Sequence, residues 1–221
     1  MSQRQHPQMA LIRVVVSEGA LRAYFPDGKA YGIPMVVPDQ VREVSIWQDT
    51  CAALDQGDEI STALTKFMEK PCRLMYMPDF VFRQVNQKYA AQATDEVGFA
   101  DGYPFLLISE ASLEDLNSRL AVPVPMNRFR PNLVIKGCSD YEEDAWKIIR
   151  IGKIRFHIAK PCSRCILVNV DQSTAARGQE PLQTLATYRK REKGVMFGQN
   201  LVQMDRGVLS LGDSLEVLEL L

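Results

Sequence analysis

Short apolar runs separated by turn residues are the feature that most constrains the fold of this chain. Many of the runs are rich in Val, Ile and aromatic residues, which favours β-strands, and Gly, Pro or Asp residues punctuate them. The runs that predict strands are residues 9–16, 20–25, 41–47, 72–77, 103–109, 132–137, 147–158, 166–170, 200–204, 207–212 and 214–220, with a turn at residues 151–153. Such a series predicts a mostly β, α+β fold built around a barrel, and not a doubly wound sheet.

Helical periodicity is confined to a few segments. The predicted helices are residues 58–70, 112–120 and 181–193. The first should end before Pro71, the second should be capped by Ser109 or Ser112, and the third carries a proline in its first turn. Residues 83–98 are polar and aperiodic, which predicts an exposed loop.

Composition narrows the class of protein. The 221 residues carry a net charge of −1, whereas binders of nucleic acid or of membrane surfaces are usually basic, so neither partner is expected. No apolar stretch approaches a membrane span, and the start "MSQRQHPQMALI" does not have the pattern of a signal peptide. The five cysteines are an odd number, which does not suit a disulfide framework. A cytoplasmic location is therefore predicted.

The segment "KPCSRCILVNVD", residues 160–171, carries the strongest chemical signal. A structural zinc site needs four ligands, but the chain has no second Cys-x-x-Cys pair and only two histidines. A thioredoxin-like redox pair places its first cysteine at a helix N-terminus, whereas these cysteines lie between two strand-like runs with no helix predicted after them. A third possibility is a single thiolate at Cys165, kept ionised by Arg164 and able to bind a soft metal. Two buried cysteines at a bend of the barrel are the fourth.

Longer motifs add a resemblance to a known family. The stretch "PCSRCILVNVD", followed by "EPLQTLATYRK", "FGQN" and "GVLSLGDSLEVL", is similar to the MOSC domain, named for the C-terminus of molybdenum-cofactor sulfurase. Upstream, "DGYPFLLISEASLEDLNSRL", "NRFRPNLVIKGC" and "YEEDAWKIIRIG" match as well. Within the family, the chain most resembles the amidoxime-reducing components and their bacterial relatives. The resemblance runs from about Ser2 to Leu218.

The resemblance implies a set of site residues. The second cysteine of the Ser-Arg-Cys triplet, Cys165, would be the molybdenum ligand, Cys162 would not be one, and Asp101 would join Cys165 as a catalytic residue. The residues that would contact the cofactor are Arg4, Gly102, Tyr103, Arg130, Asn132, Ser163, Arg164 and Asn200. Arginines suit the phosphate of the pterin because a guanidinium can bind two oxygens at once.

The resemblance also implies a domain organisation. Residues 1–80 would be a partial MOSC N-terminal β-barrel-like domain with α/β character, and residues 81–221 a MOSC domain with a β-barrel. Family members usually begin with a longer segment, so the chain is expected to be truncated at its start, which would leave residues 9–16 as an open sheet edge. The loop "QSTAARGQEPL" departs from the Thr-Gly turn usual in the family.

The expected function follows from the same resemblance. The chain would bind the molybdenum cofactor (Mo-molybdopterin) and reduce N-hydroxylated compounds, such as hydroxylamines and N-hydroxylated base analogues. Electrons would come from a separate protein of the flavin reductase, ferredoxin or cytochrome type. The resemblance further implies molybdenum-ion binding and pyridoxal phosphate binding. The alternative is a non-catalytic module that binds or carries the cofactor or its sulfur.

Overall fold

The computed structural model describes residues 1–17, 20–34 and 40–221. The chain divides into two compact units. The first unit contains Met1–Arg83 and Val170–Gly178, and the second contains Gln84–Asn169 and Gln179–Leu221. The domain boundary predicted at residue 80 stays a prediction. Within the described ranges, no helix is both long and apolar enough to cross a membrane.

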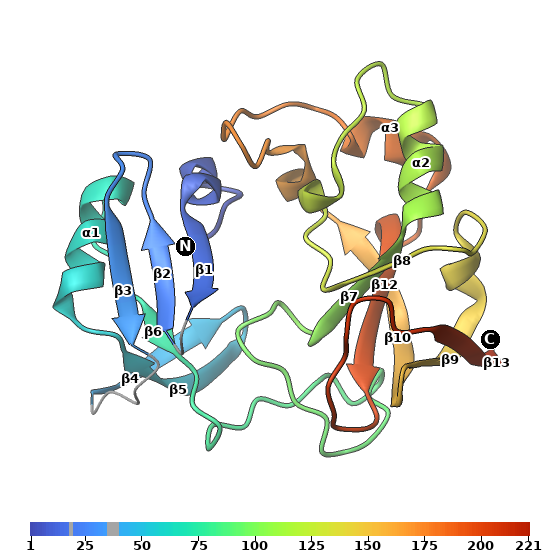
Figure 1. Ribbon diagram of the computed structural model, residues 1–221, viewed down its shortest axis with the longest axis horizontal. Coiled ribbons are helices and arrows are strands. Elements are labelled where there is room, and N and C mark those ends of the chain that lie inside the picture. The colour runs from blue at the N-terminus through green and yellow to red at the C-terminus, as the bar shows by residue number, and fades with distance from the viewer. Residues whose placement is uncertain (18–19, 35–39) are drawn as a thin grey trace. The chain divides into compact units, whose positions relative to one another are not determined.

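The first unit contains two small antiparallel sheets and one α-helix (Figure 1). One sheet has the order β1 (Arg13–Ser17), β2 (Ala20–Tyr24) and β3 (Ala30–Pro34), and β1 lies at its edge. The other has the order β4 (Val41–Ile46), β5 (Asp49–Asp55) and β6 (Met75–Tyr76). A short 3-10 helix, η1 (Pro7–Leu11), precedes β1.

Helix α1 (Asp58–Met68) covers the core of the first unit. Its residue Ile60 packs with Phe25 and Ile33 from the strands. Acidic residues occupy its first turn, where the helix dipole favours negative charge, and Glu69 ends it in a left-handed conformation two residues before Pro71. The helix predicted over residues 58–70 is confirmed, with its end two residues earlier.

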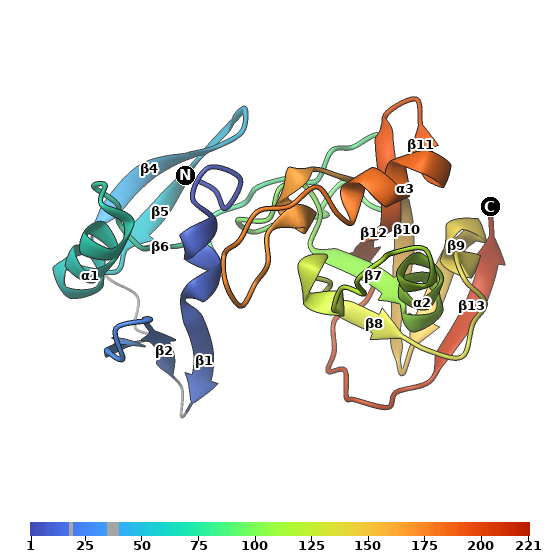
Figure 2. The ribbon, with the colours of Figure 1, turned by 90° about the horizontal axis from the view of Figure 1, so that it is seen from above.

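The second unit is built on one curled sheet. Its strand order is β13-β9-β10-β12-β7-β8, and β11 pairs with β12. The strands are β7 (Phe105–Ser109), β8 (Leu133–Ile135), β9 (Trp146–Ile151), β10 (Ile154–Arg164), β11 (Lys190–Arg191), β12 (Gly194–Gln203) and β13 (Leu215–Leu220). The pairs are antiparallel except β7 with β8, which run parallel. Figure 2 shows β7 and β8 crossing the direction of β10 and β12, as expected for a strongly curled sheet.

The two faces of this sheet bury different clusters. Because side chains alternate along a strand, Leu107 joins a core with Trp146 and Phe156, while its neighbour Ile108 joins a second core with Phe197. Helices α2 (Glu110–Ser118) and α3 (Leu182–Tyr188) cover this second core, α2 beside β7 and α3 beside β12. The mostly β, α+β architecture predicted from the sequence is confirmed.

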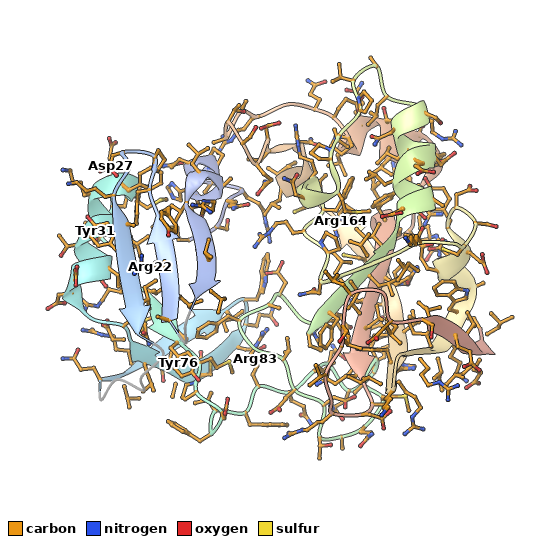
Figure 3. The ribbon with its side chains drawn as sticks, in the orientation of Figure 1. Arg22, Asp27, Tyr31, Tyr76, Arg83 and Arg164 are labelled. Carbon is orange, nitrogen blue, oxygen red and sulfur yellow. The ribbon has the colours of Figure 1, made fainter. Side chains whose placement is uncertain are left out.

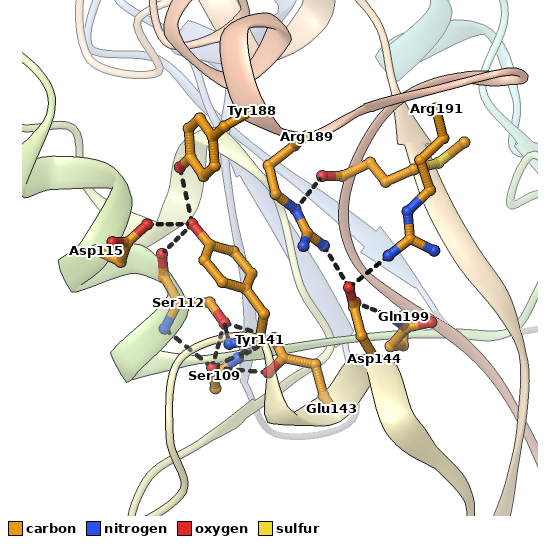
Figure 4. A network of polar contacts seen from close by, with 11 residues as sticks. Ser109, Ser112, Asp115, Tyr141, Glu143, Asp144, Tyr188, Arg189, Arg191 and Gln199 are labelled. Carbon is orange, nitrogen blue, oxygen red and sulfur yellow. Dashed lines mark hydrogen bonds and ion pairs between the residues drawn. The ribbon is translucent and has the colours of Figure 1, made fainter. Parts of the chain in front are cut away.

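A polar network fastens the helices of the second unit to the sheet (Figure 4). Asp144, on the 3-10 helix η3 (Glu142–Ala145), accepts hydrogen bonds from Arg189 at 2.7 Å, Arg191 at 2.8 Å and Gln199 at 2.6 Å. These three donors lie after α3, on β11 and on β12, so one carboxylate joins three elements.

A second carboxylate fixes the start of α2. The buried side chain of Glu143 accepts hydrogen bonds from the hydroxyls of Ser109, at 3.1 Å, and Ser112, at 2.9 Å. The Ser109 hydroxyl also accepts from the backbone N–H of Ser112 at 3.0 Å. Of the two caps left open by the sequence, Ser109 is therefore the one used.

Several predictions of secondary structure were wrong. Residues 9–11 and 166–169 form 3-10 helices, not strands, although they are rich in strand-forming residues. Residues 207–212 form no strand, and the predicted helix 181–193 ends at Tyr188 before β11. The loop expected over 83–98 is not wholly exposed, because Val85 and Val97 are buried against Val202 of β12.

Candidate functional site

The end of strand β10 positions the residues of the Cys-x-x-Cys motif. It pairs with β12, and its register shifts twice, between Ile158 and Lys160 and between Pro161 and Ser163. Such bulges turn side chains away from the regular alternation and are common beside functional sites. Cys162 lies within the second shift, Ser163 and Arg164 end the strand, and Cys165 follows it.

Arg164, which is labelled in Figure 3, is anchored by Phe129 and Cys162. Its Nη2 donates to the carbonyl of Phe129 at 2.7 Å, and its Nη1 lies 3.1 Å from the Sγ of Cys162. The guanidinium also lies 5.5 Å from the centroid of the Phe129 ring, a cation–π distance. Its Nε is buried and has no hydrogen-bond partner within the described part of the chain. An unsatisfied buried donor is rare in folded proteins and calls for an acceptor, such as a water molecule or an anion.

The two cysteines of the Cys-x-x-Cys pair have different surroundings. Cys162 is half-buried against Arg164, whereas Cys165 is exposed. Both are free thiols. A short 3-10 helix, η4 (Ile166–Asn169), begins directly after Cys165, so the sequence expectation that no helix follows the pair was wrong. The more accessible thiol is the one predicted to bind the metal.

Two glycines on β12 let the chain approach β10 and β7 closely. Gly194 has φ +126°, and a Cβ there would overlap the Ser163 hydroxyl. Gly198, of the "FGQN" motif, has φ +77°, and its Cβ would lie 2.7 Å from Ile108 and 2.8 Å from the carbonyl of Leu107. Both positions therefore favour glycine for their conformation, and Gly198 also requires it for space, because its Cβ would meet the backbone of β7.

Asn200 and Asn132 lie along one row that crosses the sheet. Asn200 of β12 is opposite Lys160 on β10 and opposite Leu106 on β7. The Oδ1 of Asn132 accepts from the N–H of Leu106 at 2.9 Å, and the N–H of Asn132 donates to the Leu106 carbonyl at 2.9 Å. The Asn132 side chain thus helps to hold β7 beside β8, which gives the residue a structural role in this chain.

Arg130 precedes Asn132 in the "RPN" motif and has an unusual backbone. Its φ of 55° is in the left-handed region, which a non-glycine residue enters at a cost of about 1 kcal/mol. The side chain is exposed and has no ion-pair partner among the residues that the structure describes. Arg130 directly follows Phe129, whose carbonyl accepts a hydrogen bond from Arg164.

Asp101, Gly102 and Tyr103 lie on the segment that leads into β7. Asp101 is exposed, and a Cβ on Gly102 would meet open space. The Tyr103 ring packs beside Val85, Val97 and Val202. Burial, with a smaller contribution from Tyr89, raises the pKa of Tyr103 to about 12, so its hydroxyl remains a donor at neutral pH.

Arg4 belongs to the first unit. Its guanidinium lies 4.7 Å from the centroid of the Trp47 ring, and its carbonyl accepts a hydrogen bond from Arg177. The structure brings Ser163, Arg164 and Cys165 together at the end of β10, with Asn200 on the neighbouring strand β12 and Asn132 directly before β8.

Sequence reasoning missed Phe129, Lys160 and Tyr89. Phe129 anchors Arg164 through its carbonyl, a contact between residues 35 positions apart that no local pattern reveals. The Lys160 ammonium lies 4.8 Å from the centroid of the Tyr89 ring and 5.1 Å from that of Tyr103. The only signal in the sequence was the position of Lys160 beside the Pro-Cys of the motif.

Comparison with protein families gives two matches along the chain. Residues 94–216 match the MOSC domain, and residues 1–71 match the MOSC N-terminal beta barrel domain. Among solved structures, the crystal structure of YiiM from Geobacillus stearothermophilus aligns with a TM-score of 0.40 at 16% identity, over 53% of this chain and 55% of that one. That likeness is too weak to support an inference.

Curated relatives share a larger part of the chain. "Mitochondrial amidoxime-reducing component 1" of Danio rerio is 33% identical over 95% of this chain and 68% of its own length. The Homo sapiens protein of that name is 32% identical over 97% and 68%. "Molybdenum cofactor sulfurase" of Oryza sativa is 30% identical over 90% of this chain but 27% of its own length. By its match to the MOSC domain model and its identity to the amidoxime-reducing components, this chain belongs to the MOSC-domain family.

Proposed function

We propose that this protein binds the molybdenum cofactor and reduces N-hydroxylated compounds, such as amidoximes, hydroxylamines and N-hydroxylated base analogues. The observation that carries the proposal is the end of β10. There the exposed thiol of Cys165 follows a guanidinium, that of Arg164, whose buried Nε has no acceptor in the described residues. The names of the relatives support the same reaction class.

The residues present fit the group. A molybdenum cofactor needs one protein thiolate, cations for its phosphate and polar groups for the pterin edge. Cys165 would supply the thiolate, which is a suitable ligand for a soft metal. Arg164 and Arg130 would supply positive charge, and Ser163 and Asn200 polar groups. When bound, the molybdenum centre supplies the two-electron redox chemistry, while the protein orients it.

The overall reaction defines what else is needed. An N-hydroxyl group takes up two electrons and two protons, the N–O bond breaks, and an amine or amidine and water are released. A separate electron-transfer protein would provide the electrons. Asp101 is exposed on the segment before β7 and is proposed to handle a proton of this reaction. Tyr103 stays protonated at neutral pH and can donate a hydrogen bond.

The test compares the two cysteines of one motif. Cys165→Ser should lose bound molybdenum and amidoxime reduction with a chemical reductant, whereas Cys162→Ser should keep most of both. Molybdenum is measured by mass spectrometry on purified protein, and circular dichroism confirms that each variant is folded. Equal molybdenum in the two variants would contradict the assignment of Cys165.

A second candidate function is a module that carries the cofactor or its sulfur without turnover. The similarity to a part of molybdenum cofactor sulfurase favours it. The two candidates differ in one measurement. Wild-type protein that holds molybdenum but reduces neither an amidoxime nor hydroxylamine, with a reduced viologen dye as donor, would favour the carrier.

A further inference from the structure

The ammonium of Lys160 lies beside two tyrosine rings of the second unit. Its Nζ is 4.8 Å from the centroid of Tyr89 and 5.1 Å from that of Tyr103, and the two rings are 6.5 Å apart at 72°. We call these three residues the lysine clamp. Its ammonium is held by cation–π contacts, which leave the N–H groups able to donate to a further partner.

The lysine clamp adjoins the row of predicted cofactor residues. Lys160 follows the first register shift of β10 and is opposite Asn200. The Asn200 amide donates to the carbonyls of Lys160 and Pro161, each at 3.4 Å. Tyr103 is itself a predicted site residue, so the clamp shares one member with the candidate site and directly contacts another.

The ammonium of Lys160 contacts aromatic rings, and none of the described carboxylates pairs with it. A second ammonium, that of Lys88, lies 5.6 Å from the centroid of the same Tyr89 ring. A half-buried cation without an acidic partner favours an anionic ligand.

We propose that the lysine clamp binds the carboxylate or phosphate of an N-hydroxylated substrate and so selects anionic substrates. The inference rests on the proposed function, which it extends by a substrate class. Lys160 supplies the charge, Tyr89 and Tyr103 orient it, and the Tyr103 hydroxyl is a second donor. The competing explanation is that Lys160 only fastens the segment containing Tyr89 to β10.

Matched substrates separate these explanations. One is a neutral aryl amidoxime, and the other is the same compound with a carboxylate on its ring. In the molybdenum-loaded protein, Lys160→Met should raise KM for the carboxylate substrate about tenfold or more, with little change in kcat, because it removes a hydrogen bond to a charged group. The neutral substrate should change less than about twofold by the same reasoning. Lys160→Arg should keep most of the preference of wild type for the carboxylate substrate. Lys153→Met, which removes an exposed lysine at the β9–β10 turn, is the control and should leave both KM values unchanged.

A binding measurement does not depend on turnover. Without a reductant, calorimetric titration should show the carboxylate amidoxime binding about tenfold more weakly to Lys160→Met than to wild type. The proposal would be overturned if Lys160→Met bound the carboxylate amidoxime as tightly as wild type does, or if it lost the same affinity for both amidoximes. Lys160 would then have a structural role only. Loss of molybdenum in Lys160→Met alone would assign the clamp to the cofactor phosphate and also overturn the proposal. If wild type reduces neither amidoxime, the proposed function fails, but the titration still shows whether Lys160 binds the carboxylate.

Discussion

Replacing Arg164 by Met should have a small effect on stability without the cofactor and a larger one with it. The guanidinium donates to the Phe129 carbonyl at 2.7 Å, and a hydrogen bond from a charged group contributes about 1.5–3 kcal/mol. The cation–π contact with the Phe129 ring adds about 0.5–1 kcal/mol. Met retains most of the apolar stem, so these polar contacts are the main loss.

Removal of an unsatisfied donor offsets part of this loss of stability. The Nε of Arg164 is buried without an acceptor in the described residues, and an unsatisfied buried donor costs about 1–3 kcal/mol. Met removes that donor. The net destabilisation of cofactor-free protein is therefore about 1 kcal/mol. If an oxyanion of the cofactor satisfies Nε, this offset disappears, and the destabilisation of loaded protein is about 3 kcal/mol.

The assay must report on the second unit alone. Trp146 is buried in its core, whereas Trp47, the other tryptophan, is in the first unit and exposed. In a Trp47→Phe background, the fluorescence of Trp146 during urea unfolding follows the second unit. Arg164→Met and Arg164→Lys are then compared with the parent, each with and without cofactor.

Arg164→Lys is the matched control. It keeps the positive charge but loses the fork that reaches both Phe129 and a second acceptor. Higher salt should weaken cofactor retention in Arg164→Met less than in the parent, because the variant has lost a screened contact. A stability loss of the same size in both forms would refute the reasoning and give Arg164 a purely structural role.

Three further predictions concern single side chains. Asp144→Asn should lower the free energy of unfolding by about 2 kcal/mol or more, measured by urea titration, because Arg189 would keep a mostly buried charge without its partner. The absorbance of tyrosinate is titrated in wild type and in Tyr103→Phe, and the difference between the two curves should show a pKa of about 12 for Tyr103. Because this pKa lies above the ordinary value of 10.0, the stability that Tyr103 contributes is complete below pH 10.0 and is lost as the pH rises toward 12. Arg155 lowers the pKa of Asp205 from 3.8 to about 2, so the stability that Asp205 contributes is present above pH 3.8 and is lost as the pH falls toward 2. In acid unfolding, the difference in stability between wild type and Asp205→Asn should therefore shrink across that pH interval.

Local sequence determined the elements whose signals lie within a few residues. The spacing of apolar residues and Pro71 located α1, and Ser109 capped α2 as one of the two residues proposed. These features depend on contacts within one or two helical turns, so the chain itself contains the information. The resemblance to the MOSC family is likewise a property of short motifs, above all the one around Cys165, and the family models match the same part of the chain.

Tertiary structure decided the rest. Residues 166–169 are rich in strand formers but become a 3-10 helix once β10 ends at Arg164, since strand propensity reflects packing with neighbours more than the backbone itself. Val85 and Val97 lie in a segment whose polar composition predicts an exposed loop, and they are buried only because Val202 meets them. The anchor of Arg164 on Phe129 and the contact of Lys160 with Tyr89 join segments far apart in the chain. Such pairings depend on sheet register and on the two bulges of β10, which no local pattern of residues specifies.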